Sequence, residues 1–223
     1  MEIKKNFEMS ERYILGMTLA FVGGFLDSYT FVSRGQVFAN AQTGNMVLLG
    51  MELSNKNYIK AGSYLAPILA FVLGVLISEF VRTNHPNRML HWRQSIVLFE
   101  IIMLFVVAFI PIGHYNIVAN VIVSFVCSLQ VETFRKMHGR NYATTMCTGN
   151  LRSGSELLYH FFINKDKFSI EMSLKYFGII IIFILGGITG FELTNIYLEK
   201  TIFLACFGLS IVFFLMFYKI KEQ

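Results

Sequence analysis

The tripeptide Thr43-Gly44-Asn45 recurs in the second half of the chain as Thr148-Gly149-Asn150. Each copy is followed by a run with the pattern of a helix. Moving the first copy onto the second by 105 positions (148 minus 43) also places Asp27 on Glu132 without a gap, so an acid stands sixteen residues before each tripeptide. A repeat of this kind decides how the whole fold is interpreted and is therefore considered first.

The correspondence continues beyond the tripeptides. With a shift of 112 positions, residues 71–74 (Phe-Val-Leu-Gly) fall on residues 183–186 (Phe-Ile-Leu-Gly), which corresponds to an insertion of seven residues. The sequence therefore predicts a single duplicated domain over residues 1–223, with a first repeat from about 10 to 113 and a second from about 114 to 219.

Apolar residues come in long runs, and 55% of the 223 residues are hydrophobic against 15% charged, which excludes an ordinary soluble domain. A helix needs about 20 mostly apolar residues to cross the hydrocarbon layer. Six stretches meet or approach this requirement: 13–33, 61–81, 96–113, 116–134, 174–194 and 201–219. They lack the alternation of a membrane barrel strand, so helices are the spanning form. We predict an all-α integral membrane protein whose main partner is the lipid bilayer.

The net charge of +5 does not indicate a nucleic-acid partner, because the basic residues are scattered among connecting loops. They bear on topology, since cytoplasmic loops of membrane proteins collect Lys and Arg. If neither tripeptide segment crosses the bilayer, thirteen basic residues, Lys4 and Lys5 among them, lie on one side and four, including Arg34, on the other. If both segments cross, giving eight spans, the two sides hold nine and eight. The charges favour six transmembrane helices with both termini in the cytoplasm.

Each half has three spans, which is an odd number, so the second copy has the opposite orientation in the membrane. Such inverted repeats commonly place a binding site near the midplane, with broken helices aimed at it. We predict re-entrant or broken helices starting near the two threonines, which are favoured helix caps. The glycine allows close backbone approach, and the asparagine amide could meet a small polar or anionic solute at the positive helix end. The candidate binding residues are Thr43, Gly44, Asn45, Thr148, Gly149 and Asn150.

The alternative interpretation of these segments involves no ligand. In that interpretation Thr caps the helix, Gly packs and Asn bonds a neighbouring helix.

Asp27 lies on a helical face of small and polar residues, because Gly16, Ala20, Gly23 and Thr30 share its three- and four-residue spacing. A charged Asp at the centre of a membrane helix costs about 2.5 to 3.5 kcal/mol, which makes an acid in such a place a functional candidate. We expect Asp27 to face the interior of the bundle and to bind substrate or an ion.

Glu132 is the matching candidate in the second half. Arg135 and Lys136 follow within one turn, so an interfacial salt bridge explains it equally well. Glu100 also lies inside an apolar run, with Arg93 on about the same face. We expect Glu100 to be interfacial or paired with another helix.

Small residues predict close helix packing. Gly186 and Gly190 form a GxxxG pair that matches Gly74 and Ser78, a pattern that joins helices within a bundle or across a dimer. A homodimer is compatible with the sequence but not required by it. The expected packing residues are Gly23, Gly24, Gly74, Gly186 and Gly190.

Patterns of catalysis are largely missing. The sequence has no HExxH, no GxSxG and no P-loop, and its five histidines lack the spacing of metal ligands. We therefore expect no cofactor, no metal, no catalytic residue and no enzymatic activity.

The run Gly23-Gly24-Phe25-Leu26-Asp27-Ser28-Tyr29, followed by Gly35, Val37-Phe38-Ala39 and the first tripeptide, resembles the YoaK family of bacterial membrane proteins. That family is defined chiefly as a domain of unknown function, and the resemblance covers nearly the whole chain. In the second half Gln130 fits the family pattern, whereas Glu132 and the polar stretch 152–156 depart from it. The resemblance implies a bacterial cytoplasmic membrane protein and supplies no substrate.

Three functions remain open at this point. The leading hypothesis is a small secondary transporter or permease in which Asp27, and less surely Glu132, exchanges a proton or cation while the helix starts bind a solute. The second is a non-transporting assembly or lipid-interaction protein whose polar groups only fasten helices together. The third is a membrane enzyme that uses two carboxylates for acid-base chemistry.

Overall fold

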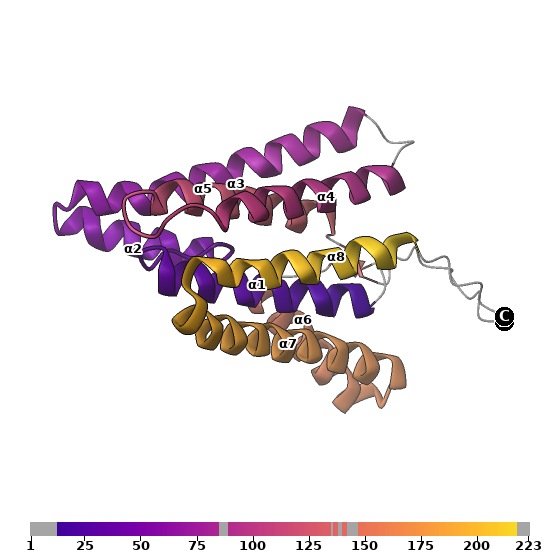
Figure 1. Ribbon diagram of the computed structural model, residues 1–223. Coiled ribbons are helices and arrows are strands. Elements are labelled where there is room, and N and C mark those ends of the chain that lie inside the picture. The colour runs from indigo at the N-terminus through magenta and orange to yellow at the C-terminus, as the bar shows by residue number, and fades with distance from the viewer. Residues whose placement is uncertain (1–12, 85–88, 135, 138–139, 142–146, 218–223) are drawn as a thin grey trace.

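The computed structural model describes residues 13–84, 89–134, 136–137, 140–141 and 147–217. Lys4, Lys5 and Arg135 lie outside these residues. Apart from one short antiparallel strand pair, the regular elements of the described chain are helices, and Figure 1 shows them gathered into a bundle. In chain order the elements are α1 (Tyr13–Ser33), α2 (Gln42–Ser54), α3 (Tyr58–Asn84), α4 (Met89–Val107), α5 (Asn116–Thr133), β1 (Lys136–Met137), β2 (Arg140–Asn141), α6 (Cys147–Asn164), α7 (Lys167–Tyr197), the 3-10 helix η3 (Leu198–Ile202) and α8 (Phe203–Phe217).

Four helical stretches of the described residues are long and apolar enough to cross a membrane: Tyr13–Ser33, Tyr58–Asn84, Asn116–Thr133 and Lys167–Phe217. The last has 51 residues, which as one straight helix would be about 75 Å long and far exceed a hydrocarbon core of about 30 Å. It is broken at η3, where Leu198 has a φ of 51°. The chain reverses there, so that α8 runs back past α7 (Figure 1).

The two tripeptides lie in the first turns of α2 and α6, as the sequence predicts. Neither helix is among the four apolar stretches. The 13 residues of α2 reach only about 20 Å, which is too short for a crossing. The predicted role of Thr43 as helix cap is wrong, because α2 begins one residue earlier and Ala41 occupies the cap position without a side-chain bond. Gln42 is the first residue of the helix instead, and its side-chain amide donates to the backbone carbonyl of Ala39.

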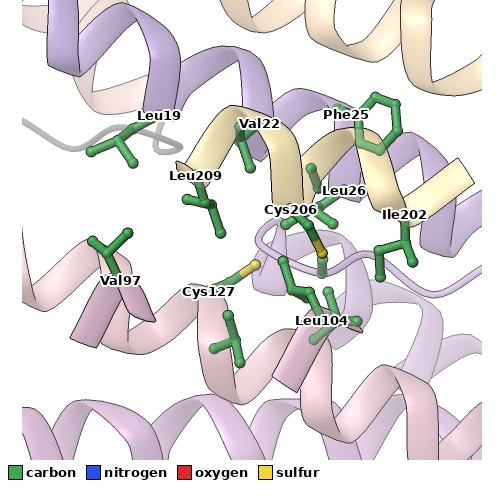
Figure 2. Packing of buried hydrophobic residues seen from close by; sticks show 14 of the residues in the cluster. Leu19, Val22, Phe25, Leu26, Val97, Leu104, Cys127, Ile202, Cys206 and Leu209 are labelled. Carbon is green, nitrogen blue, oxygen red and sulfur yellow. The ribbon is translucent and has the colours of Figure 1, made fainter. Parts of the chain in front are cut away.

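Corresponding helices of the two halves make corresponding contacts. The pairs α1 with α7 and α5 with α3 are in contact, as are α2 with α3 and α6 with α7. The pairs α1 with α8 and α5 with α4 follow the same pattern, and α4 also packs against α8. The largest apolar cluster lies among α1, α4, α5 and α8, and Figure 2 shows Leu19, Val22, Val97 and Leu209 meeting inside it.

The turns that follow α2 and α6 have the same construction. Lys56 and Lys165 both adopt left-handed backbone conformations, with φ of 58° and 52°. The next residue caps the following helix: Asn57 accepts a bond from the amide of Lys60 at 3.4 Å, and Asp166 from that of Ser169 at 3.0 Å. The sequence shows this likeness only in part, because the two turns share the pair Asn-Lys (Asn55-Lys56 and Asn164-Lys165), whereas the capping residue is Asn57 in one and Asp166 in the other.

The outer faces of the bundle are apolar. Large hydrophobic side chains of α3 and α7 are exposed, which is the reverse of a soluble protein and suits contact with lipid. They include Leu69, Leu73, Leu76, Phe80, Ile181, Leu185 and Ile188.

Candidate functional site

Asp27 points into the protein, with 7% of its surface exposed, and lies beside the start of α2. Its Oδ1 accepts hydrogen bonds from the backbone amides of Asn40 at 2.6 Å and Ala41 at 3.4 Å. These are the two residues immediately before the helix, where the dipole is positive. The carboxylate of α1 thus takes the place of the missing cap of α2 and fixes one helix against the other.

The segment between α1 and α2 is held by two asparagines. Asn45 is fully buried; its Oδ1 accepts from the amide of Phe38 at 2.9 Å, and its Nδ2 donates to the carbonyl of Phe38 at 2.8 Å and to Gln42 at 2.9 Å. Asn40 donates from its side chain to the carbonyl of Gly23 at 3.2 Å. The amide of Asn45 is therefore used within the protein, and it organises the site without facing a solute.

A cavity of about 660 Å³ joins this segment to the second tripeptide. Its wall combines Asp27 of α1, Thr43 of α2, Thr148 and Gly149 of α6, and Gly187 of α7. The two repeated segments, 105 positions apart, thus meet at one cavity with the acid of the first half. Its size falls within the usual range of small-molecule pockets, about 300 to 1,000 Å³.

The chemistry of the wall is acidic and aromatic. Among the described residues that line the cavity, Asp27 is the sole carboxylate and none is Lys, Arg or His. The rings of Phe31 and Phe38 stack in the wall with centroids 4.7 Å apart. The other phenylalanines of the lining are Phe71, Phe183 and Phe191, and its further polar side chains are Ser28, Asn40, Gln42, Thr43 and Thr148.

Glu132 does not line this cavity. Its Oε1 lies 3.9 Å from Nε of Arg82 on α3, with side-chain exposures of 16% and 34%. Arg82 is also bonded in two places to Glu79, one turn earlier on its own helix. The partner in this contact comes from another helix, whereas Arg135 and the side chain of Lys136, the partners considered from the sequence, lie outside the described residues. The two acids that the repeat aligns therefore stand in different surroundings.

The remaining residues of the two tripeptides differ in their exposure to solvent. Thr43, Thr148 and Gly149 are accessible, and Asn150 is buried like its counterpart Asn45. Gly44 does not line the cavity, because a side chain there would meet the ring of Phe38 at 2.9 Å. Threonine and the second glycine are thus the tripeptide groups that a solute could reach.

The packing glycines hold helix pairs together inside the chain. A side-chain carbon at Gly24 or Gly186 would collide with the backbone carbonyl of Phe183 or Phe21, which shows how closely α1 and α7 approach. At Gly190 the nearest atom would be the carbonyl oxygen of Phe25, at 2.6 Å. Gly74 packs α3 against Ser128 and Phe125 of α5. Gly23 is buried, and its carbonyl accepts the bond from Asn40.

Two buried charges are placed differently from the sequence-based interpretation. Arg34, expected in an outer loop, is fully buried; its guanidinium donates to Tyr29 Oη and to the carbonyls of Val107 and Pro111 at the end of α4. Glu100, expected to be interfacial or paired, is also fully buried, and neither of its oxygens has a hydrogen-bond partner. A single charge in a predicted loop carries no signal that it will fold inward, so Arg34 was missed.

In the described part of the chain, no three His, Cys, Asp or Glu side chains gather as a metal site would require.

Comparisons with known proteins identify the family. The model of the family described as "Protein of unknown function (DUF1275)" matches residues 15–215. The chain belongs to this family. It is also 26% identical over 145 residues to the "UPF0700 transmembrane protein YoaK" of Bacillus subtilis (strain 168), an alignment that covers 60% of this chain and 62% of that relative.

The chain thus spans about three fifths of the length of that relative. No solved structure matches the chain. With the apolar helices and the transmembrane relative, the family places this chain among all-α, multi-pass membrane proteins, and the predicted resemblance to YoaK-type proteins is confirmed.

Proposed function

We propose that the protein is a small secondary transporter or permease of the bacterial cytoplasmic membrane, and not an enzyme, that carries a small polar solute through the cavity beside Asp27. The observation that carries the proposal is the cavity itself. It gathers the starts of two short or polar helices and one acid at a single place, which is the arrangement in which transporters bind solutes.

The charge of the wall favours a cation over the anionic solute considered from the sequence. An anion would meet the Asp27 carboxylate, and no Lys, Arg or His among the described lining residues would compensate it. Of the two helix starts at the cavity, that of α2 is already occupied by Asp27. Phenyl rings bind ammonium groups through their faces. The proposed solute is therefore a small organic ammonium ion.

Six spans in an inverted repeat remain our proposal for the architecture. It is supported by the reciprocal packing, because the repeat places α1 on α5 and α3 on α7, and the contact of α1 with α7 has its counterpart in that of α5 with α3. The matched turns at Lys56 and Lys165 also support it. A homodimer, if formed, needs a face other than Gly186 and Gly190, since these residues already hold α1.

Topology is tested by labelling single cysteines from each side of the membrane. Arg34 is unsuitable because it is buried, so Gln36→Cys and Lys56→Cys are the better pair, both being exposed. The protein background carries serine at Cys127, Cys147 and Cys206. Six spans with both termini in the cytoplasm predict that the two positions are labelled from the same, outer side, whereas labelling from opposite sides would overturn that topology.

The solute class is tested by the thermal stability of purified protein with tetraethylammonium as the probe and ethanesulfonate as the anionic control. A ligand present at about 100 times its Kd stabilises the folded state by about 2.7 kcal/mol. We expect tetraethylammonium to raise the melting temperature of the native protein and of Glu132→Gln, but not of Asp27→Asn. Stabilisation by ethanesulfonate instead would reject a cation site.

A second function is favoured by one specific contact. Because Asp27 holds the start of α2, it could serve assembly alone, as the non-transporting alternative requires. Asp27→Asn separates the two functions, because the substitution removes the charge while the side-chain amide oxygen can still accept the two hydrogen bonds. Under the assembly alternative, Asp27→Asn retains stability and no solute stabilises any form of the protein.

A further inference from the structure

Glu100 lies in the interior of the apolar cluster. It is placed three residues after Val97 and four before Leu104, which puts all three on one face of α4. Val97 and Leu104 belong to the cluster that also contains Cys127 and Cys206, and Figure 2 shows these four side chains within that cluster. The side chain of Glu100 is 0% exposed.

Among the described residues, no positive side chain is bonded to the carboxyl of Glu100. Neither Oε1 nor Oε2 has a hydrogen-bond partner. By contrast, the equally buried guanidinium of Arg34 is bonded to a hydroxyl and two carbonyls. An isolated carboxylate in an apolar interior is very costly, and such groups are retained only with a compensating positive charge. The site therefore requires a bound cation.

A proton is the cation that fits. Hard metal ions in proteins need several oxygen ligands, about six to eight for Ca²⁺ and six for Mg²⁺. Among the described residues no three His, Cys, Asp or Glu side chains gather as such a site would require, and the two oxygens of Glu100 have no hydrogen-bond partner. A proton needs a single oxygen and no further ligand.

The groups around Glu100 come from each neighbouring helix. On α5, Cys127 belongs to the same apolar cluster as Val97 and Leu104 of α4 and as Leu26, the residue before Asp27 on α1. On α8, the Cys206 thiol donates to the carbonyl of Ile101, next to Glu100. On α4 itself, the buried Arg93 lies about two turns away. In η3, Lys200 donates to the carbonyl of Ala108 at the far end of α4, and Glu199 is beside it.

We propose that Glu100 is a proton-binding site in the interior of the protein, and that release of its proton depends on the charge at Asp27 in the cavity wall. Glu100 and Asp27 adjoin the same apolar cluster through Val97 and Leu104 on one side and Leu26 on the other. Two carboxylates in one apolar interior repel each other, so the ionisation of one opposes that of the other. A cation bound at Asp27 offsets its negative charge and favours departure of the proton from Glu100. This coupling rests on the proposed function, whereas proton binding itself does not.

The consequence for transport is an exchange in which charges balance. The O–H bond of Glu100 breaks and leaves a carboxylate, the proton leaves the protein, and the bound organic cation supplies the positive charge that the protein has lost. The proton would then be the coupling ion of the proposed transporter.

Infrared spectroscopy of the purified full-length protein tests the site without any solute. We expect a carboxylic-acid C=O band at neutral pH that is absent from Glu100→Gln and retained in the control Glu79→Gln, which alters a part-exposed, ion-paired acid. In Asp27→Asn the band should disappear at a pH lower by about half a unit or more, because a nearby negative charge has been removed.

Two results would overturn the proposal: a native spectrum with no acid band that depends on residue 100, or a titration of that band that Asp27→Asn does not move. If Glu100→Gln does not fold, Glu100→Asp replaces it, since a shorter acid must shift the band and an unchanged band would reject the assignment. If the band behaves as expected but tetraethylammonium does not bind, the proposed function fails and the proton site stands.

Discussion

The two halves of the chain carry an acid at matched positions, Asp27 and Glu132, and the same tripeptide, and they use them differently. In the first half, Asp27 is buried, bonds the backbone before α2 and lines the cavity. In the second half, Glu132 is partly exposed, faces Arg82 and stands away from the cavity lining. Both tripeptide segments nevertheless reach that cavity through Thr43 and Thr148.

This difference shows that the helix packing is more alike in the two halves than the placement of the acidic side chain is. The packing glycines Gly74 and Gly186, the turns at Lys56 and Lys165 and the helix contacts correspond in the two halves, whereas the acid lines the cavity only in the first. A single acid is consistent with one cavity shared by both halves. The predictions below compare matched positions in the two halves.

The largest effect is expected at the packing glycines. Gly186→Ala places a carbon against the backbone of Phe21, which cannot move away, and should destabilise the protein by about 3 kcal/mol. At the matched Gly74→Ala, the Ser128 hydroxyl can rotate away and the nearest backbone atom, the Phe125 carbonyl oxygen, is at 2.9 Å, so we expect about half that loss. Denaturation of the purified protein in detergent measures both.

Gly62→Ala is the control for these two substitutions. A carbon at Gly62 meets nothing within 4 Å, and removal of a helix glycine should stabilise by about 0.5 to 1 kcal/mol. Equal losses for Gly186→Ala and Gly74→Ala, or a loss for the control, would show that close approach does not distinguish the two helix pairs.

A smaller effect is expected at the two acids. Asp27→Ala removes the acceptor from the amides of Asn40 and Ala41 and should cost about 1.5 to 3 kcal/mol, as bonds to charged groups do. Glu132→Ala removes a partly exposed ion pair at 3.9 Å and should cost about 1 kcal/mol or less.

Thermal unfolding of the two variants measures this difference, with Asp27→Asn as the form that keeps the acceptor oxygen. A greater loss at Glu132 than at Asp27 would reverse the comparison between the halves.

The smallest effect is expected at the matched turns. Hydrogen bonds from the Ser169 hydroxyl and the Phe168 amide lower the pKa of Asp166, whereas its counterpart Asn57 does not titrate. Because the pKa of Asp166 is lower in the folded protein, the carboxylate stabilises the fold at pH values above the ordinary pKa of an aspartate. This contribution is lost as the pH falls through the lowered pKa of the folded state. Asp166→Asn should therefore weaken the loss of stability on acidification, measured as melting temperature from about pH 6 to about pH 3.

Asn57→Asp supplies the matching test in the first half. The new carboxylate should add a loss of stability on acidification that the native turn lacks. An acid profile unchanged by both substitutions would show that these caps do not contribute.

Much of the fold could be predicted from the sequence, because long apolar runs predict membrane-spanning helices directly. The first span was placed at residues 13–33, the bounds of α1, and the short helices begin within two residues of Thr43 and Thr148. Close packing at Gly24, Gly186 and Gly190 also followed from local spacing, although the partner helix did not.

The parts that could not be predicted depend on contacts between residues far apart in the chain. Arg34 folds inward because the carbonyls at the end of α4 accept its donors, 73 and 77 residues away. Arg82 lies opposite Glu132, and the cavity exists only where α1, α2, α6 and α7 converge. Thr43 was assigned as a cap because a threonine at a helix start is a common signal, and the acid that takes this role comes from another helix.

The central claim is that Asp27, and not its repeat partner, makes the cavity a cation site. Its most direct test is uptake of radiolabelled tetraethylammonium into liposomes that contain the purified protein, compared among the native form, Asp27→Asn and Glu132→Gln. The account predicts saturable uptake by the native form and Glu132→Gln, and none above empty liposomes for Asp27→Asn. Equal uptake by the native form and Asp27→Asn would contradict it.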